Sequence, residues 1–293
     1  MLKFPKKTDT MRNVQISYTT SPISEYLGSQ IYASVGIPVH ETKLGVFDNK
    51  LVVACKDITF ENMEQIGKLN MFSDLKNLYN PKLFDSYSNS GDTKLNKTLQ
   101  EINTNYFVEQ LGVDIVLERF WTMFIIDTLI YNNDRNNGNW GLLINGDVKL
   151  APVYDNGNSF NNKFSDREMY NRMEKIDVLQ CKKITSVFRD DEDKLLIPYE
   201  FFETQNIKEL NQAIEKVVPL IDIKKIFSII DELPNEYADI KISSDISKEF
   251  MKKGIAARYD LILKPALEKI LSYQSEKKPS VLDTLAKESA KIK

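Results

Sequence analysis

The first sixty residues contain short apolar runs that are separated by polar turns. The opening residues MLKFP predict a strand that ends at Pro5, because proline cannot donate a hydrogen bond to a neighbouring strand. Further along, ETKLGVFDNKLVVACKDI holds two apolar runs that are joined by Asp48, Asn49 and Lys50. Such residues favour tight turns, so this segment is predicted to be a β-hairpin.

A helix is predicted between that strand and the hairpin, in SPISEYLGSQIYASVG. Ser21 can cap its first turn, Pro22 suits the first helical position, and Gly36 can end it. Four apolar side chains recur at helical spacing and define one inward face: Ile23, Leu27, Ile31 and Val35. Together these elements predict a small α+β unit.

After about residue 58 the apolar pattern becomes mainly helical. The segment DIVLERFWTMFIIDTLIY, residues 114–131, predicts a central core helix. A polar loop is expected at residues 86–97, and WGLLINGDVKLAPVY is expected to form a second hairpin with Asn145 and Gly146 in its turn. Further helices are expected at about residues 167–182, 206–218, 222–232 and 246–273.

The fold class expected from this pattern is α+β with two lobes. The small, strand-rich N-terminal lobe is assigned to residues 1–57 and the larger, mainly helical C-terminal lobe to residues 58–275. Residues 276–293 contain many lysines and are expected to form a flexible tail. No internal repeat is evident.

Composition and charge exclude several kinds of partner. The 293 residues are 42% hydrophobic and 28% charged, which is ordinary for a globular protein. The net charge of −3 gives no basic field along the chain, so no nucleic-acid partner is expected. The N-terminus lacks the apolar stretch of a signal peptide, and the most apolar segment is short for a membrane span and carries Asp127. A cytoplasmic protein without membrane insertion is expected, with non-classical export or effector delivery left open.

Cysteine and histidine are too rare for several kinds of site. Two cysteines, Cys55 and Cys181, cannot build a disulfide framework, and Cys55 is interpreted as a packed residue rather than a reactive thiol. The single histidine, His40, precedes a predicted strand and is assigned a structural role. A site with several histidines is impossible, so acid and base chemistry falls mainly to carboxylates.

The polar stretch at residues 131–160 follows the central apolar helix directly and holds the candidate chemistry. Asp134 and Asn139 lie five residues apart in a loop, and Asp155 follows the second hairpin. Phosphoryl transfer from ATP requires an aspartate near the attacking hydroxyl and oxygen ligands for magnesium, and these three residues supply both. The plainer alternative is an Asx-rich turn that caps the ends of helix and strand. A calcium-binding loop is rejected, because glycine falls at position 7 and Leu143 occupies position 12.

The same stretch also resembles a known family. YNNDRNNGNWGLL together with LAPVYDNGNSF resembles the catalytic and metal-binding segments of the HipA-type serine/threonine kinases. ISEYL, VVACKD and ERFW resemble in particular the cell-translocating kinase A branch of that family. The similarity covers most of residues 1–160 and weakens beyond them, and several motifs occur in the expected order. It implies a two-lobed, protein-kinase-like fold that binds ATP between the lobes and uses Mg²⁺.

Matched residue by residue, the resemblance assigns roles in the proposed site. Asp134 matches the catalytic aspartate. Asn139 and Asp155 match the metal-binding asparagine and aspartate, which also contact the nucleotide. Lys3 in LKFPK matches the strand lysine that contacts the ATP phosphates. Glu25 is a weaker match for the partner of that lysine, since the helical wheel places it away from the apolar face.

The remaining matches concern the nucleotide. Ala54, Cys55 and Lys56 match the strip that joins the lobes, whose backbone meets adenine. Asn136 stands where the family has a histidine, so altered nucleotide contacts are expected rather than loss of chemistry. The family also has strands and a phosphate-covering loop before the lysine strand, whereas this chain begins two residues before Lys3. A shortened N-terminal lobe is therefore expected.

The function expected from the sequence is transfer of phosphate from ATP to serine or threonine hydroxyls of a protein substrate, including the kinase itself. One alternative is a catalytically impaired nucleotide-binding protein or scaffold that has lost phosphate contacts. Another is a small-molecule or lipid kinase, although no basic or amphipathic membrane patch supports it. For Asp127 two roles stay open: a half-exposed position on the helix, or an anchor for the catalytic loop.

Overall fold

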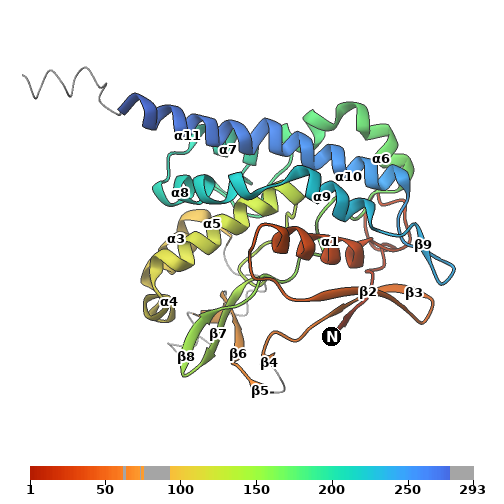
Figure 1. The fold of residues 1–293 in the computed structure, drawn as a ribbon, viewed down its shortest axis with the longest axis horizontal. Coiled ribbons are helices and arrows are strands. Elements are labelled where there is room, and N and C mark those ends of the chain that lie inside the picture. The colour runs from red at the N-terminus through yellow and green to blue at the C-terminus, as the bar shows by residue number, and fades with distance from the viewer. Residues whose placement is uncertain (62–63, 73, 76–92, 278–293) are drawn as a thin grey trace, which may run out of the picture.

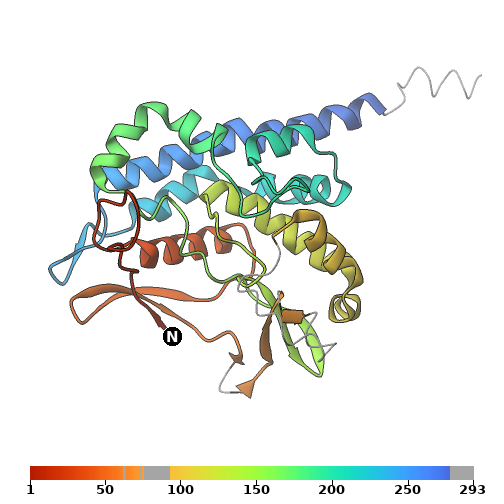
Figure 2. The same ribbon diagram turned by 180° about the vertical axis from the view of Figure 1, so that it is seen from behind.

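The computed structural model describes residues 1–61, 64–72, 74–75 and 93–277. A small sheet and one long helix, α1, lie on one side of a larger body that consists mainly of helices (Figures 1 and 2). The strands are β1 (Leu2–Lys3), β2 (Thr42–Phe47), β3 (Lys50–Cys55), β4 (Phe60–Glu61), β5 (Glu64–Gln65), β6 (Lys68–Met71), β7 (Gly141–Asn145), β8 (Asp147–Leu150), β9 (Glu236–Tyr237) and β10 (Ile240–Lys241). The helices are α1 (Ser21–Ser34), α3 (Leu95–Thr104), α4 (Tyr106–Leu111), α5 (Val113–Ile130), α6 (Asp166–Arg172), α7 (Pro198–Thr204), α8 (Lys208–Val217), α9 (Ile223–Asp231), α10 (Asp245–Arg258) and α11 (Lys264–Lys277).

The small sheet has the antiparallel order β1-β3-β2. Lys3 in β1 lies opposite Val53 in β3, so the first strand of the chain borders the end of the hairpin. The predicted hairpin is confirmed, and its turn residues Asp48 and Asn49 have φ values of 51° and 53°. Aspartate and asparagine tolerate this left-handed conformation, which suits the twist of a hairpin. Lys50, predicted in the turn, already belongs to β3.

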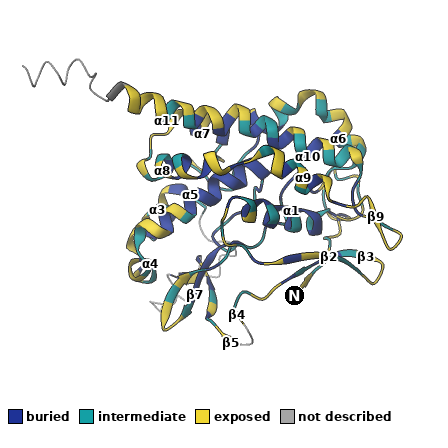
Figure 3. Ribbon diagram, in the orientation of Figure 1, coloured by how far each residue is buried: buried dark blue, intermediate teal, exposed yellow. Residues whose placement is uncertain are grey.

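Helix α1 was predicted over the correct residues, but its cap was wrong. Thr20 rather than Ser21 is the N-cap residue, and no side chain accepts a hydrogen bond from the first turn. Gly36 follows the end of the helix with φ of 78°, a conformation that glycine adopts without steric cost. Polar residues of α1 are buried as well as the apolar face, because the helix lies between the small sheet and the larger body (Figure 3).

Helix α5 is the centre of the larger body, as its apolar sequence predicted. Thirteen of its residues are buried, and the helix is enclosed on all sides near its C-terminal end. It ends at Tyr131, which adopts the left-handed conformation (φ 54°, ψ 54°) and turns the chain into the polar loop. None of the helices in the described part of the chain is long and apolar enough to cross a membrane.

The second hairpin is also present, with Gly146 at its turn (φ 75°), and Asn145 is the last residue of β7 rather than a turn residue. β6, which was not predicted, adds a third strand to it in the order β6-β7-β8. Gly141 allows this pairing, because a Cβ atom there would lie 2.0 Å from the carbonyl oxygen of Asn70.

The later helices agree with the sequence pattern in position but differ in regularity. The helix expected at residues 167–182 stops at Arg172 and continues as a 3-10 turn and a π turn, and the one expected at 246–273 is interrupted by a π turn. Helices α3, α4 and α7 had not been predicted individually. Of the polar loop expected at residues 86–97, residues 95–97 already belong to α3, and residues 86–92 lie outside the described part of the chain. So do residues 278–293 of the expected tail, and the lobe boundary after residue 57 stays a prediction.

Candidate active site

The polar loop after α5 is held in shape by its own amide side chains. Asn139 donates from Nδ2 to the carbonyl oxygen of Asp134 (2.6 Å), and the N–H of Gly138 donates to Oδ1 of Asn136 (2.8 Å). The N–H of Asp134 donates to Oδ1 of Asn132 (3.2 Å). The loop thus contains the Asx turns of the plainer interpretation, but none of these three hydrogen bonds uses the carboxylate of Asp134.

The carboxylate of Asp134 has one partner among the described residues. Asn136 donates from Nδ2 to its Oδ1 at 3.1 Å. The other oxygen, Oδ2, accepts no hydrogen bond from any described residue. Asn136, at the position of the family histidine, thus orients the aspartate and also braces the loop backbone.

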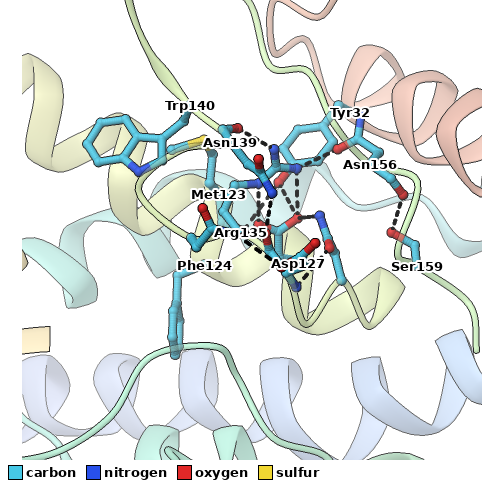
Figure 4. Close-up of polar contacts among 12 residues, drawn as sticks. Tyr32, Met123, Phe124, Asp127, Arg135, Asn139, Trp140, Asn156 and Ser159 are labelled. Atoms are coloured by element: carbon cyan, nitrogen blue, oxygen red, sulfur yellow. Dashed lines mark hydrogen bonds and ion pairs between the residues drawn. The ribbon is translucent and has the colours of Figure 1, made fainter. Parts of the chain in front are cut away.

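Beneath the loop, Arg135 and Asp127 form an ion pair inside the protein (Figure 4). Arg135 Nε lies 2.8 Å from Asp127 Oδ2, and Arg135 Nη2 lies 3.2 Å from Asp127 Oδ1. Their side chains are only 4% and 6% exposed. Tyr32 of α1 donates its hydroxyl to Asp127 Oδ1 at 2.9 Å. Of the two roles left open for Asp127, the structure therefore selects the anchor for the catalytic loop.

Arg135 also joins the catalytic loop to the segment that carries Asp155. Its Nη1 donates to the carbonyl oxygens of Asn139 (2.9 Å) and Tyr154, and its Nη2 donates to Asn156 Oδ1 (2.5 Å). Burial alone would lower the pKa of Arg135, but the charge and hydrogen bonds of Asp127, together with the charges of Tyr32 and Asp155, raise the pKa above its usual value. The guanidinium is therefore permanently charged and holds the two predicted metal-binding segments in fixed positions.

Asn156 fits tightly against α1. It is fully buried, its N–H donates to Glu25 Oε1 (3.1 Å), and its Nδ2 donates to Ser29 Oγ (3.2 Å). A Cβ atom on Gly28 would lie 2.6 Å from Cβ of Asn156. Glycine at position 28 is thus required for α1 to approach this segment. The preceding residue, Asp155, has φ of 61°, which turns its carboxylate out of the chain path toward Lys3.

Lys3, Glu25 and Asp155 form a second ionic cluster. Lys3 Nζ lies 2.6 Å from Asp155 Oδ1 and 3.0 Å from Glu25 Oε2. The pairing of Lys3 with Glu25, the weaker sequence match, is therefore confirmed. Glu25 lies away from the apolar face of α1, as the helical wheel indicated, but this polar side of the helix is buried as well and faces the cavity. Its carboxylate is only 1% exposed.

The other oxygen of Glu25 faces His40, the single histidine of the chain. Glu25 Oε1 lies 2.8 Å from His40 Nε2, and His40 is buried. Burial would raise the pKa of Glu25, but the hydrogen bonds and charges of His40 and Lys3 lower it to about 2. For Lys3, burial would lower the pKa, but Glu25 and Asp155 together raise it. Both groups are therefore charged at neutral pH.

Cys55 lies next to this cluster, so Glu25, His40 and Cys55 have the residue types of a metal site. Their ligand atoms all lie within 4.8 Å of one another. However, Glu25 already accepts hydrogen bonds from Lys3, His40 and Asn156, and burial raises the pKa of the Cys55 thiol to about 11. A cation here would have to displace these partners. We interpret the three residues as a hydrogen-bonded core with a packed thiol, as the sequence predicted for Cys55.

One cavity collects the predicted catalytic groups. Lys3, Glu25, Asp134 and Asp155 all line it, although they come from β1, α1, the catalytic loop and the segment after β8. Its other walls are formed by Phe4, Lys6, Met11, Thr19, Ser21, Gly157, Asn158, Asn162 and Lys163. Asn139 is not among the residues that line this cavity; its Nδ2 donates to the carbonyl oxygen of Asp134, and no described group donates to its Oδ1.

The strip Ala54, Cys55 and Lys56 does not line this cavity. The N–H and the carbonyl oxygen of Cys55 both pair with Met1, at 2.8 Å each, and the N–H of Lys56 donates to the carbonyl oxygen of Glu41 (2.9 Å). The backbone contact of this strip with adenine stays a prediction.

Three parts of the site were missed in the sequence: Arg135, Asn156 and the contact of His40 with Glu25. Arg135 directly follows Asp134, the predicted catalytic residue. Asp127 is an acidic residue inside the apolar helix, and it signals that a cation must lie nearby, since unpaired buried charge is costly. Arg135 could therefore have been identified from the sequence. Asn156 gave no comparable signal, because DNG is ordinary turn sequence.

Known proteins resemble this chain in sequence and in fold. The chain is 35% identical over 269 residues to the serine/threonine-protein kinase CtkA of Helicobacter pylori, which covers 90% of this chain and 77% of CtkA. The crystal structure of CtkA superposes with a TM-score of 0.77 at 32% identity, over 92% of this chain and 87% of that chain. HipA of Shewanella oneidensis, from a complex with HipB and operator DNA, gives a TM-score of 0.53 at 11% identity, over 91% and 60%. No protein-family model matches the chain.

The fold is thus the two-lobed fold of the protein kinases, in agreement with the α+β class predicted from the sequence. The similarity to HipA shows the fold alone, because the identity is low. The chain belongs to the HipA-like serine/threonine-protein kinases and is close to CtkA, as its motifs indicated.

Proposed function

We propose that this protein transfers the γ-phosphoryl group of ATP to serine or threonine hydroxyls of a protein substrate. The observation that supports this most strongly is the cavity that unites Lys3, Glu25, Asp134 and Asp155 from four distant parts of the chain. Phosphoryl transfer depends on positioning and on charge stabilisation, and these residues supply a cation for phosphate and carboxylates for the acceptor and the metal.

Asp134 is the proposed catalytic base. Its Oδ1 is held by Asn136 while Oδ2 accepts no hydrogen bond from a described residue, so one oxygen is fixed and the other can accept the proton of the acceptor hydroxyl. The buried pair of Arg135 and Asp127 keeps the loop in place while that proton moves. This arrangement provides orientation before the reaction begins, which is the main contribution expected of the protein.

Lys3 is the proposed phosphate contact. An ammonium group has three N–H donors, and in the structure two of them point to Glu25 and Asp155. The third is left for a phosphate oxygen. Lys3 is 26% exposed and lies at the cavity wall, so a phosphate can reach it.

Asn139 and Asp155 are the proposed magnesium ligands. Oδ1 of Asn139 and Oδ2 of Asp155 accept no hydrogen bonds from the described residues, so both are available, and their oxygen chemistry fits a hard cation. When bound, magnesium neutralises charge on the phosphates. The chain contributes the two side chains, and Arg135 fixes the backbone beside them through the carbonyl oxygens of Asn139 and Tyr154.

The proposal is tested with Asp134→Ala and Asp155→Ala, assayed for transfer of labelled γ-phosphate to a general protein acceptor and to the kinase itself. Loss of an acid–base or metal-binding carboxylate is expected to lower the rate by about 10²–10⁴-fold or more. Asp147→Ala is the matched control, because Asp147 is exposed at the far end of the second hairpin.

Circular dichroism and urea unfolding establish that each variant is folded. Undiminished transfer by either folded variant would refute the assignment. If ATP raises the melting temperature of the wild-type protein without any phosphoryl transfer, the protein is a nucleotide-binding scaffold instead.

A further inference from the structure

His40 takes no part in the chemistry proposed above, yet it is buried against the cluster that contains Lys3. We propose that His40 is a positioning residue: it occupies one oxygen of Glu25, so that Glu25 engages only one of the three donors of Lys3 and a donor remains for ATP. This inference rests on the proposed function and assigns a further residue to the same site.

The two oxygens of Glu25 have separate partners. Oε1 lies 2.8 Å from His40 Nε2 and accepts the N–H of Asn156 at 3.1 Å, whereas Oε2 accepts from Lys3 at 3.0 Å. Because the carboxylate of Glu25 is ionised, its oxygens can only accept, so the hydrogen lies on His40 Nε2. His40 and Asn156 thus fix the rotation of the carboxylate and leave a single oxygen for Lys3.

His40 is itself held firmly by the segment that carries Asp155. Its backbone N–H donates to the carbonyl oxygen of Val153 (3.0 Å), and the N–H of Val153 donates to the carbonyl oxygen of Pro38 (2.8 Å). Val153 lies two residues before Asp155. The histidine therefore links α1, the start of β2 and the metal-binding segment, and it places Glu25 relative to Asp155.

Removal of the histidine donor leaves the N–H of Asn156 as the one remaining partner of Oε1 among the described residues, so this oxygen can accept a further hydrogen bond. An ammonium next to a carboxylate with two available oxygens can donate to both. The third N–H of Lys3 would then donate to Oε1 of Glu25. The phosphate contact of Lys3 would then have to compete with a buried carboxylate. Weaker ATP binding follows, although no catalytic group has been changed.

The chain offers closely matched variants. His40→Ala removes the donor, whereas His40→Gln keeps an N–H donor near the place of Nε2. Thr42→Val is the nearby control, because Thr42, the first residue of β2, is buried two residues after His40 and its hydroxyl has no hydrogen-bond partner. The dissociation constant of ATP with Mg²⁺ is measured by calorimetry, together with KM for ATP and kcat.

His40→Ala is expected to raise the ATP dissociation constant about tenfold, the size of one lost hydrogen bond to a charged group. His40→Gln is expected to recover most of that loss, and Thr42→Val to lie within about twofold of the wild type, as for a residue without a polar contact. KM should rise with the dissociation constant while kcat changes less, because Asp134 is untouched.

A second measurement separates positioning from a general structural role. In a Lys3→Ala background there is no ammonium group whose third N–H could be kept for ATP, so His40→Ala should no longer weaken ATP binding. An equal loss in both backgrounds, or no loss in the wild-type background, would overturn the inference. If the wild-type protein neither binds ATP nor transfers phosphate, the proposed function fails instead, and the two failures are distinguishable.

Discussion

Two ionic clusters support the site, and they differ in how they are built. The pair of Arg135 and Asp127 lies inside the larger body, with both side chains almost completely buried. The cluster of Lys3, Glu25 and Asp155 lies at the cavity wall, where Glu25 is buried but Lys3 and Asp155 are 26% and 42% exposed. The first cluster is surrounded by protein, whereas one side of the second cluster is exposed to solvent.

The difference shows how one architecture can combine rigidity with ligand exchange. Neither water nor a ligand competes with the buried ion pair for hydrogen bonds, since every hydrogen-bonding partner of Arg135 is another part of the chain. At the cavity wall, Lys3 and Asp155 are partly exposed, so in the proposed function they can take up a phosphate and a metal, while Glu25 and His40 are buried. The inner cluster, Arg135 and Asp127, therefore determines where the loops lie. The outer cluster, Lys3, Glu25 and Asp155, can exchange partners.

The largest effect is expected when the inner cluster is broken. Arg135→Met leaves the Asp127 carboxylate buried without its cation and should lower the free energy of unfolding by about 3–5 kcal/mol, measured by urea denaturation. The control is Lys216→Met, because Lys216 pairs with Glu118 on the surface with side chains 61% and 50% exposed. That variant should cost about 1 kcal/mol or less. Equal losses would show that burial does not distinguish the pairs.

A smaller effect is expected where α1 meets the outer cluster. Gly28→Ala places a Cβ atom 2.6 Å from Cβ of Asn156, which is fully buried and held by several hydrogen bonds. Overpacking of this kind should lower the free energy of unfolding by up to about 3 kcal/mol. Gly45→Ala is the matched control, since a Cβ atom at position 45 meets nothing within 4 Å. A Gly28→Ala protein as stable as Gly45→Ala would contradict the close approach.

The smallest of the three effects depends on pH. The folded-state pKa of Glu25 is lowered to about 2 from 4.5, so its ionisation stabilises the fold above pH 4.5 and this contribution is lost as the pH falls toward 2. The stability difference between the wild type and Glu25→Gln should therefore shrink by about 2 kcal/mol between pH 5 and pH 3. Urea unfolding at the two pH values measures it. A difference that stays constant would show that the pKa of Glu25 is the same in the folded and unfolded states, which contradicts the lowered value.

The sequence predicted the parts of the fold with strong local patterns. The hairpin of β2 and β3 and the apolar helix α5 were found because alternation and turn residues, or a long apolar run, leave little choice of structure. Strand β6 was not found, because it pairs with β7 about seventy residues further along and carries no pattern of its own. The cap of α1 was assigned to the wrong residue, since Thr20 and Ser21 are both suitable by type.

The same division applies to the site. Asp134, Asn139, Asp155 and Lys3 could be proposed as site residues because motif order was informative, and the structure brings Lys3, Asp134 and Asp155 to one cavity. Of the partners behind them, Glu25 could be named only as a weak match, because the helical wheel placed it away from the apolar face, and Arg135 and Asn156 were not named. His40 was correctly assigned a structural role, but its partner lies fifteen residues away and depends on tertiary packing.

The contact between Lys3 and Asp155 also bears on how the protein folds. These residues are 152 positions apart in sequence, and Arg135 and Asp127 only eight. Contacts within a helix and its following loop form early, whereas a contact that closes so long a loop must wait until its entropy cost is met by the surrounding core. The loop with the proposed catalytic base can thus be in place before Lys3 arrives, and we expect the contact between Lys3 and Asp155 to form late in folding.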